Sequence, residues 1–261
     1  IRRIDEARAA GIDVTMAQYP YTAGSTFLHV VIPPWYHSRG VDGLLRALRE
    51  ERGAIKHDLD TRMDWENFSQ SVGWEKIFVS SVVSEANQPC VGKSISQIAA
   101  ERGHADPADA AFDLLVEEQL AVGMISFGLD EADITAIMRH PAVSFITDGL
   151  MSGRPHPRAY ATYPRILGRY VREQGVLSLE EAVRKMTSLP ARKIRLRNKG
   201  VIAEGYDADL VVFDPDTVID KNSYDDPRVH PAGIAHVLVN GVFVVEDAAL
   251  TGARPGRVIR D

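Results

Sequence analysis

A short apolar segment that ends in an acidic residue constrains the fold of this chain more than any other feature. Residues 142–146 are rich in valine, isoleucine and phenylalanine, which is typical of a buried β-strand. The sequence Thr147-Asp148-Gly149 follows, so the carboxylate of Asp148 stands just past the carboxyl end of that strand. Barrels of alternating strands and helices carry their reactive groups at this end of the strands. The segment therefore favours an α/β fold.

A cationic residue follows in the next loop. Arg158 comes ten residues after Asp148, and His156 lies close by between Pro155 and Pro157. A planar guanidinium binds a carboxylate through two parallel hydrogen bonds. One anionic and one cationic group tethered to the same strand end therefore suggest chemistry on a small molecule that carries a carboxylate.

Length, charge and cysteine content exclude several classes of protein. The chain has 261 residues and a net charge of −6, and no basic stripe argues for nucleic acid. No apolar run approaches the roughly 18 residues of a membrane span, so we expect no membrane partner. Cys90 is the single cysteine, so no internal disulfide can form, which fits a reducing compartment. We predict a cytoplasmic protein and leave its oligomeric state open.

Hydrophobic periodicity predicts a mixture of strands and helices. After Lys199 the pattern changes to short strands, and Asn240-Gly241 between apolar runs is a strong hairpin signal. Residues 22–26 are predicted as a loop. The other strands are expected at 12–17, 76–83, 124–127 and 142–146, and the helices at 41–52, 94–102, 107–119, 130–139, 163–174 and 178–186.

The first residues predict that the chain is the C-terminal part of a longer protein. It opens with IRRIDEARAAGIDVT, which lacks an initial methionine and has helical spacing before a strand. The alternative is a short native helix at a processed N-terminus.

Several stretches carry a resemblance to a known family. They are AQYPYTAGSTFL, ITDGLMSGRPHPRAYATYPRILGRYVRE, SLEEAVRKMTSLPARKI, GVIAEGYDADLVVFDP and HVLVNGVFVVEDAALTGARPGRVIR. Together they make the chain similar to the C-terminal part of the N-acyl-D-amino-acid deacylases, or D-aminoacylases, of the amidohydrolase superfamily. The tail alone is generic to that superfamily, whereas YPYTAGST together with DG…HPR is more specific to the deacylases.

The resemblance implies the C-terminal portion of a (β/α)₈ TIM-like barrel of a metal-dependent hydrolase, with an inserted lid and a small β-sandwich domain. Residues 1–40 would be a barrel segment and residues 41–125 the lid subdomain. Residues 126–198 would hold the second barrel segment, and residues 199–261 the β-sandwich. A connection as long as the expected lid is otherwise hard to explain inside a barrel unit.

The resemblance also implies an activity, zinc-dependent hydrolysis of the amide bond of N-acyl-D-amino acids to a carboxylate and a free D-amino acid. The strand at 12–17 would be barrel strand seven, and the strand before Asp148 would be strand eight. Asp148 would be the catalytic acid and base, and it would touch a weak or second metal position. Arg158, Tyr19 and Ser25 would bind the α-carboxylate of the N-acyl amino acid substrate. We prefer Tyr19 to Tyr21 because it is nearer the end of the strand, and the alternative is that the two tyrosines exchange roles.

The sequence departs from the family at the metal site. The family takes most of its zinc ligands from earlier strands, including a His-x-His pair, and this sequence has no such pair. Of the metal-site residues only Asp148 carries over, so we expect this chain to be inactive alone. For the remaining candidates we favour structural roles over metal or substrate binding; these are His29, His37, Cys90, His156, Asp207 and Asp209.

Two other functions stay open. A cyclic-amide hydrolase of the dihydroorotase or hydantoinase type would share the generic tail but would not need the YPYTAGST and HPR pairing. A non-catalytic half-barrel that binds a partner chain would explain the absent ligand strands.

Overall fold

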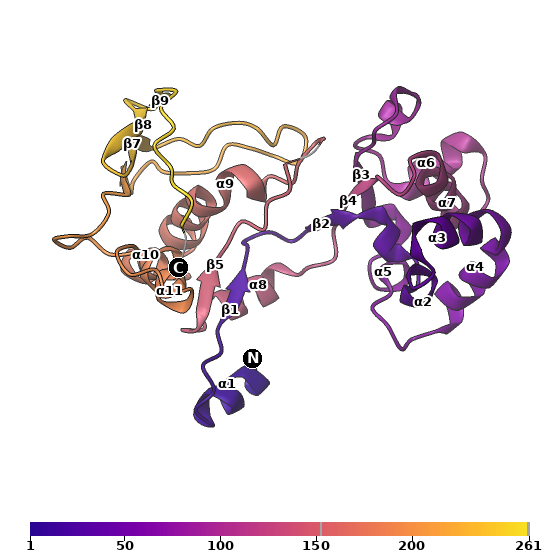
Figure 1. Ribbon diagram of the computed structural model, residues 1–261, viewed down its shortest axis with the longest axis horizontal. Helices are drawn as coiled ribbons and strands as arrows, with labels where there is room; N and C mark the ends of the chain where they lie inside the picture. The colour runs from indigo at the N-terminus through magenta and orange to yellow at the C-terminus, as the bar shows by residue number, and fades with distance from the viewer. Residues whose placement is uncertain (152, 260–261) are drawn as a thin grey trace. The chain divides into compact units, whose positions relative to one another are not determined.

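The computed structural model describes residues 1–151 and 153–259, which form two compact units of mixed α/β structure (Figure 1). Unit 1 contains Ile1–Pro20, Ala132–Asp148 and Tyr160–Asp261. Unit 2 contains Tyr21–Glu131 and Gly149–Ala159. The chain therefore leaves unit 1 after Pro20, and it leaves it again after Asp148.

Unit 1 contains a parallel pair of short strands, β1 (Met16–Gln18) and β5 (Val143–Phe145). Gln18 lies opposite Phe145, and the next amide, that of Ile146, donates to the Gln18 carbonyl at 3.0 Å. β5 lies within the predicted strand at 142–146, whereas β1 begins four residues after the start of the strand predicted at 12–17 and ends one residue beyond it. Only the residues that face a partner strand enter the ladder. Parallel pairing brings the carboxyl ends of β1 and β5 to the same edge.

Helices surround this pair, and the buried side chains of unit 1 include Phe145, Ile166 and Tyr170. Ser178 caps α10 by accepting a hydrogen bond from the Glu181 amide at 3.2 Å. The helix expected at 163–174 is instead the end of α9 followed by a π-helix, η4. The bounds are α1 Arg2–Ala9, α8 Glu131–Met138, α9 Arg158–Arg165, η4 Ile166–Glu173, α10 Leu179–Met186 and α11 Ser188–Lys193.

The C-terminal part of unit 1 is an antiparallel sheet in the order β6-β7-β8-β9. The predicted hairpin joins β7 to β8, and both of its turn residues have positive φ, 49° at Asn240 and 76° at Gly241. Such angles are what a two-residue hairpin turn requires. The bounds are β6 Leu210–Phe213, β7 Ile234–Val239, β8 Val242–Glu246 and β9 Ala249–Leu250.

Unit 2 contains a second antiparallel sheet in the order β2-β4-β3. Its strands are β2 (Gly24–Phe27), β3 (Ile77–Ser81) and β4 (Gly123–Ser126). The prediction of a loop at 22–26 is wrong, because β2 pairs with a strand far along the chain, and Ser25 lies opposite Ile125. Pairing over such a sequence distance overrides the weak strand preference of Gly-Ser-Thr.

Helices pack on this sheet around an apolar core that includes Leu48, Phe112 and Leu115. A full capping box starts α6, since Ser94 and Gln97 each accept a hydrogen bond from the other's backbone amide. The helices are η1 Leu28–Val31, α2 Pro34–His37, α3 Gly40–Glu50, α4 Arg52–Thr61, α5 Phe68–Ser71, η2 Trp74–Lys76, η3 Glu85–Cys90, α6 Ile95–Arg102 and α7 Pro107–Glu117.

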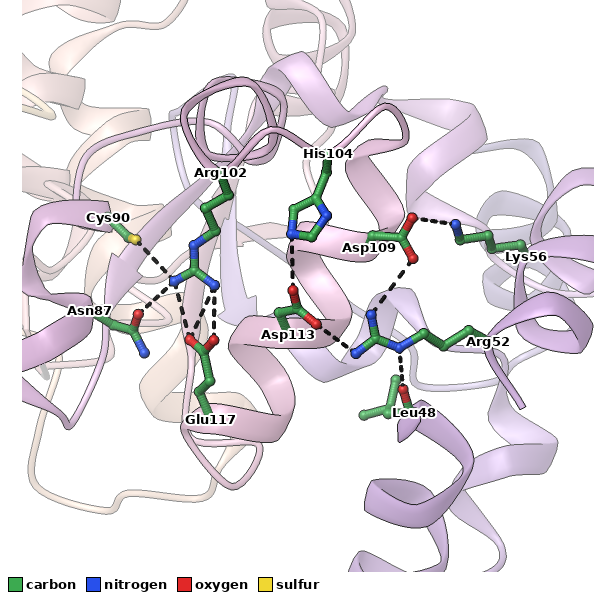
Figure 2. Close-up of polar contacts among 10 residues, drawn as sticks. All are labelled: Leu48, Arg52, Lys56, Asn87, Cys90, Arg102, His104, Asp109, Asp113 and Glu117. Carbon is green, nitrogen blue, oxygen red and sulfur yellow. Dashed lines mark hydrogen bonds and ion pairs between the residues drawn. The ribbon is translucent and has the colours of Figure 1, made fainter. Parts of the chain in front are cut away.

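Ion pairs join α7 to its neighbours in unit 2 (Figure 2). Arg52 at the start of α4 contacts Asp113 at 2.6 Å. His104 contacts the other carboxylate oxygen of Asp113 at 2.9 Å, and Arg102 contacts Glu117 at 3.1 Å. These contacts fix α4 and α6 against the polar side of α7, while its apolar side enters the core.

In the part of the chain that the structure describes, every helix is too short or too polar to cross a membrane. The finer expectations of barrel segments, a lid and a β-sandwich stay predictions.

Candidate functional site

Two of the predicted site residues lie at one edge of unit 1. Tyr19 directly follows β1, and Asp148 comes three residues after β5. β1 and β5 are parallel, and Gln18 pairs with Phe145. Tyr19 and Asp148 therefore both lie just past the carboxyl ends of the two strands. The structure therefore places a phenol and a carboxylate where α/β proteins bind their ligands.

The backbone at Asp148 is unusual. Its φ is 45°, in the left-handed region that few non-glycine residues occupy. The residue is exposed, as is Gly149, whereas Val143 and Phe145 in the preceding strand are buried. Asp148 therefore lies exposed in unit 1, three residues after the buried strand β5.

The other two predicted site residues meet in unit 2. Arg158 begins α9 and is only 1% exposed, which is rare for an arginine. Its Nη2 atom donates a hydrogen bond to the carbonyl oxygen of Ser25 at 3.1 Å. The half-buried Ser25 belongs to β2. The structure therefore fixes the guanidinium next to the backbone of the serine that was predicted to share its ligand.

His156 lies within the same group of residues. It is 1% exposed, its Nε2 atom is 2.9 Å from the Ala23 carbonyl oxygen, and its Nδ1 atom accepts a hydrogen bond from the Arg158 amide at 3.0 Å. The edge of its ring meets the Tyr21 ring at a centroid distance of 5.0 Å. These contacts join His156 to the backbone of two segments of unit 2.

Sequence reasoning did not identify Tyr21 and Ala23 as partners of the HPR segment. Their contacts join residues that are far apart in the chain, and His156 lies 133 positions from Ala23. The only local signal was the pair of prolines, Pro155 and Pro157, which restricts the backbone around this histidine.

His29 and His37 lie together in unit 2, with ring centroids 5.5 Å apart. They line two adjoining pockets of about 400 and 380 Å³. The other lining residues are mostly apolar and include Leu44 and Phe68. Burial lowers the pKa of His29, and the neighbouring His37 lowers it further. Neither pocket contains any of the four residues predicted for the site.

The remaining candidates have structural surroundings. Cys90 is buried, and its Sγ atom lies 3.8 Å from an Arg102 nitrogen (Figure 2). Asp207 pairs with Lys199 at 3.0 Å, and Asp209 also pairs with that lysine. The two aspartates therefore neutralise one ammonium group beside the C-terminal sheet.

The residues that the structure describes do not form a zinc site by themselves. Residues 1–151 and 153–259 contain no group of three or more histidine, cysteine, aspartate or glutamate side chains that could hold a metal. A zinc site in a hydrolase needs at least three protein ligands. Asp148 could contribute one carboxylate to a site whose other ligands lie elsewhere.

Comparison with known proteins identifies the class to which this arrangement belongs. Residues 88–245, more than half of the chain, match the model of the Amidohydrolase family. The chain is therefore a member of the amidohydrolase family.

Three relatives sharpen the comparison. The chain is 38% identical over its full length to an N-acyl-D-glutamate deacylase, and 36% identical over 97% of its length to a D-aminoacylase, both from Alcaligenes xylosoxydans xylosoxydans. It spans 44% and 43% of those two proteins, less than half of each. A crystal structure of N-acyl-D-glutamate deacylase from Bordetella bronchiseptica, with zinc and a phosphonate mimic of the tetrahedral intermediate, is 34% identical. It matches all of this chain with a TM-score of 0.76, and 45% of that protein is covered.

Proposed function

We propose that this chain is part of a zinc-dependent hydrolase that cleaves the amide bond of N-acyl-D-amino acids and releases a carboxylate and a free D-amino acid. The observation that carries the proposal is the match of all 261 residues of this chain to part of a deacylase, together with a strand-end carboxylate and a guanidinium bonded to the backbone at the positions named above. An α-carboxylate and a scissile amide are the two groups of such a substrate that these side chains suit.

Asp148 would move the protons of the reaction. Amide hydrolysis needs a base that accepts a proton from the attacking water and an acid that delivers one to the leaving nitrogen. A single carboxylate can do both in turn. Asp148 is exposed, three residues past the end of β5, which suits a group that exchanges protons with water.

Arg158, Ser25 and Tyr19 would bind the substrate carboxylate. The hydrogen bond to the Ser25 carbonyl uses one guanidinium nitrogen and restricts the plane of the group. A group held in this way loses little side-chain entropy when it binds an anion. Anchoring the carboxylate while the amide is attacked leaves one direction for the side chain, which would give selectivity for the D-enantiomer.

The zinc ligands would come from protein outside the described residues. The relatives are more than twice as long as this chain, and the structure of one of them contains zinc. Residues 1–261 alone would then bind no catalytic zinc and would be inactive. The proposed barrel segments, lid and β-sandwich belong to the same picture, in which this chain is the C-terminal portion of the enzyme.

A substrate panel tests the proposal. We would incubate the full-length protein with the D- and L-enantiomers of N-acetylglutamate, N-acetylleucine and N-acetylmethionine, and with hydantoin and dihydroorotate as cyclic amides. Chiral chromatography of the released amino acid gives the rate for each substrate. Hydrolysis of the N-acetyl-D-amino acids, with little turnover of the L-enantiomers and cyclic amides, is the expected result.

Two outcomes would refute the proposal in different ways. Turnover of the cyclic amides alone would assign the protein to the dihydroorotase or hydantoinase type. No turnover of any substrate by a zinc-loaded full-length protein would favour a non-catalytic binding module.

A further inference from the structure

We propose that His156 is a positioning residue that holds Arg158 and the entry to β2 in the arrangement needed to bind the substrate carboxylate. This inference rests on the proposed function, because it gives His156 a role only through the carboxylate that Arg158 and Ser25 would bind. His156 itself would touch no reacting atom.

The hydrogen bonds of His156 define its protonation state. The backbone amide of Arg158 can only donate, so Nδ1 of His156 must carry a lone pair in order to accept its hydrogen at 3.0 Å. The carbonyl of Ala23 can only accept, so Nε2 must carry the proton that it receives at 2.9 Å. The ring is therefore the neutral tautomer with its proton on Nε2, and each nitrogen has one backbone partner.

The ring connects two segments that lie far apart in the sequence. Ala23 comes two residues before Ser25, and His156 comes two residues before Arg158. In addition, the guanidinium of Arg158 donates a hydrogen bond to the Ser25 carbonyl at 3.1 Å. The segment at Ala23 and Ser25 is thus joined to the segment at His156 and Arg158 by two side chains, the imidazole and the guanidinium.

The surroundings of His156 keep this link rigid. The ring is 1% exposed, and the edge-to-face contact with Tyr21 limits its rotation. Pro155 and Pro157 restrict the backbone on both sides. A neutral ring also adds no charge beside the guanidinium of Arg158.

Loss of this link would affect only binding energy that depends on the carboxylate. A displacement of about 1 Å in a positioning contact can lower a rate about 100-fold. A substrate analogue without the carboxylate does not use Arg158, so its turnover would not depend on His156. This difference separates a positioning role from a general loss of folding.

The experiment uses the full-length, zinc-loaded protein with two substrates. One is the N-acetyl-D-amino acid that wild type hydrolyses fastest, and the other is the matching N-acetyl amine, in which hydrogen replaces the α-carboxylate. His156→Ala is compared with wild type and with His57→Ala, which removes an exposed histidine of the same unit. Two further variants separate the hydrogen bonds: His156→Asn keeps an acceptor near Nδ1, and His156→Gln keeps a donor near Nε2.

We expect His156→Ala to lower kcat/KM for the amino acid about 10- to 100-fold, mainly through KM, and to leave kcat/KM for the amine within about twofold. His156→Asn should recover more of the loss than His156→Gln, because its acceptor restores the bond to the Arg158 amide directly. His57→Ala should behave as wild type with both substrates.

Equal losses with the two substrates, or an unchanged KM for the amino acid, would overturn the inference while leaving the proposed function intact. If His156→Ala does not fold, the comparison of His156→Asn with His156→Gln decides. A larger loss of kcat/KM for the amino acid in His156→Asn than in His156→Gln would also contradict the inference. Failure of the proposed function would look different, because wild type itself would then release no D-amino acid.

Discussion

Unit 2 closes around its own apolar core, whereas the C-terminal sheet of unit 1 leaves many apolar side chains in contact with solvent. In unit 2, Phe112 and Leu115 are completely buried. In the sheet, Val211 is 54% exposed and Leu250 71% exposed. A buried apolar side chain in unit 2 therefore contributes more to the free energy of folding than an exposed one in the C-terminal sheet.

The proposed site residues of the two units also differ in solvent exposure. Asp148 stands exposed at the end of a three-residue strand of unit 1. Arg158 is buried within unit 2 and is hydrogen-bonded to the backbone. A buried guanidinium has a fixed direction that needs a stable core around it, whereas a carboxylate that exchanges protons with water must stay accessible. The comparison predicts where substitutions harm folding and where they harm only the reaction.

The largest effect is expected at the exposed carboxylate. Asp148→Asn in the full-length protein should lower kcat about 10²- to 10⁴-fold, because the amide cannot exchange protons with the attacking water. Thermal unfolding should change little, since the side chain is exposed. Steady-state kinetics and calorimetry measure the two quantities. The control is Asp133→Asn, an exposed aspartate of α8, and a similar loss of kcat there would contradict the assignment.

The contrast in burial predicts the next effect. Leu115→Ala should lower the free energy of unfolding by about 2–5 kcal/mol, because it leaves a cavity in the core of unit 2. The same substitution at Leu250 should change it by less than about 0.5 kcal/mol. Urea unfolding of both variants gives the comparison. Equal losses at the two leucines would mean that the sheet is as well buried in solution as the core.

A buried carboxylate in unit 2 gives a smaller effect with a distinct pH dependence. Burial alone would raise the pKa of Glu118, but hydrogen bonds from Ser84, Asn87 and the Val83 amide outweigh it and lower that pKa to about 2. Glu118→Gln should therefore cost about 1–3 kcal/mol of unfolding free energy at pH 7.

The direction of the pH dependence follows from the lowered pKa. The stabilisation by Glu118 is fully present above its unfolded pKa of 4.5 and is lost as the pH falls from there toward 2. The difference between wild type and Glu118→Gln in urea unfolding should shrink over that range. Glu117→Gln is the control, because its carboxylate is more exposed and pairs with Arg102. An equal pH dependence for both variants would refute the role given to Glu118.

The smallest effect is expected beside the C-terminal sheet. Lys199→Ala removes the partner of Asp207 and Asp209, which are partly exposed. Surface ion pairs contribute about 0–1 kcal/mol, so unfolding should change within that range. The zinc content of the full-length protein should stay unchanged in Asp209→Asn. A fall in bound zinc would reveal a metal site where we assign an ion pair.

Local signals in the sequence predict much of this structure. The Asn240-Gly241 turn depends on two adjacent residues, and it occurs as expected. The strand β2 was missed because only pairing with β4, about 100 positions away, makes it a strand. Periodicity also did not reveal the π-helix η4, because π-helices are rare and mostly occur as short segments inside α-helices.

The candidate site also has features that local sequence signals predict and features that depend on long-range contacts. The types and order of Asp148, Arg158, Tyr19 and Ser25 could be noticed in the sequence, and the parallel pairing that brings Tyr19 and Asp148 to one edge follows from an α/β fold. The bond between Arg158 and the Ser25 carbonyl, and the tautomer of His156, depend on contacts over more than 100 residues. Such contacts leave no periodic trace in a single sequence.

The most direct test of the central claim is a measurement of bound zinc and D-amino acid release on two samples, the full-length protein and residues 1–261 alone. Both are stripped of metal and then titrated with zinc. We predict that the full-length protein regains hydrolysis of N-acetyl-D-amino acids as it binds zinc, whereas residues 1–261 bind no catalytic zinc and stay inactive. Zinc-dependent deacylation by residues 1–261 alone, or a full-length protein that binds zinc without deacylating, would contradict the account.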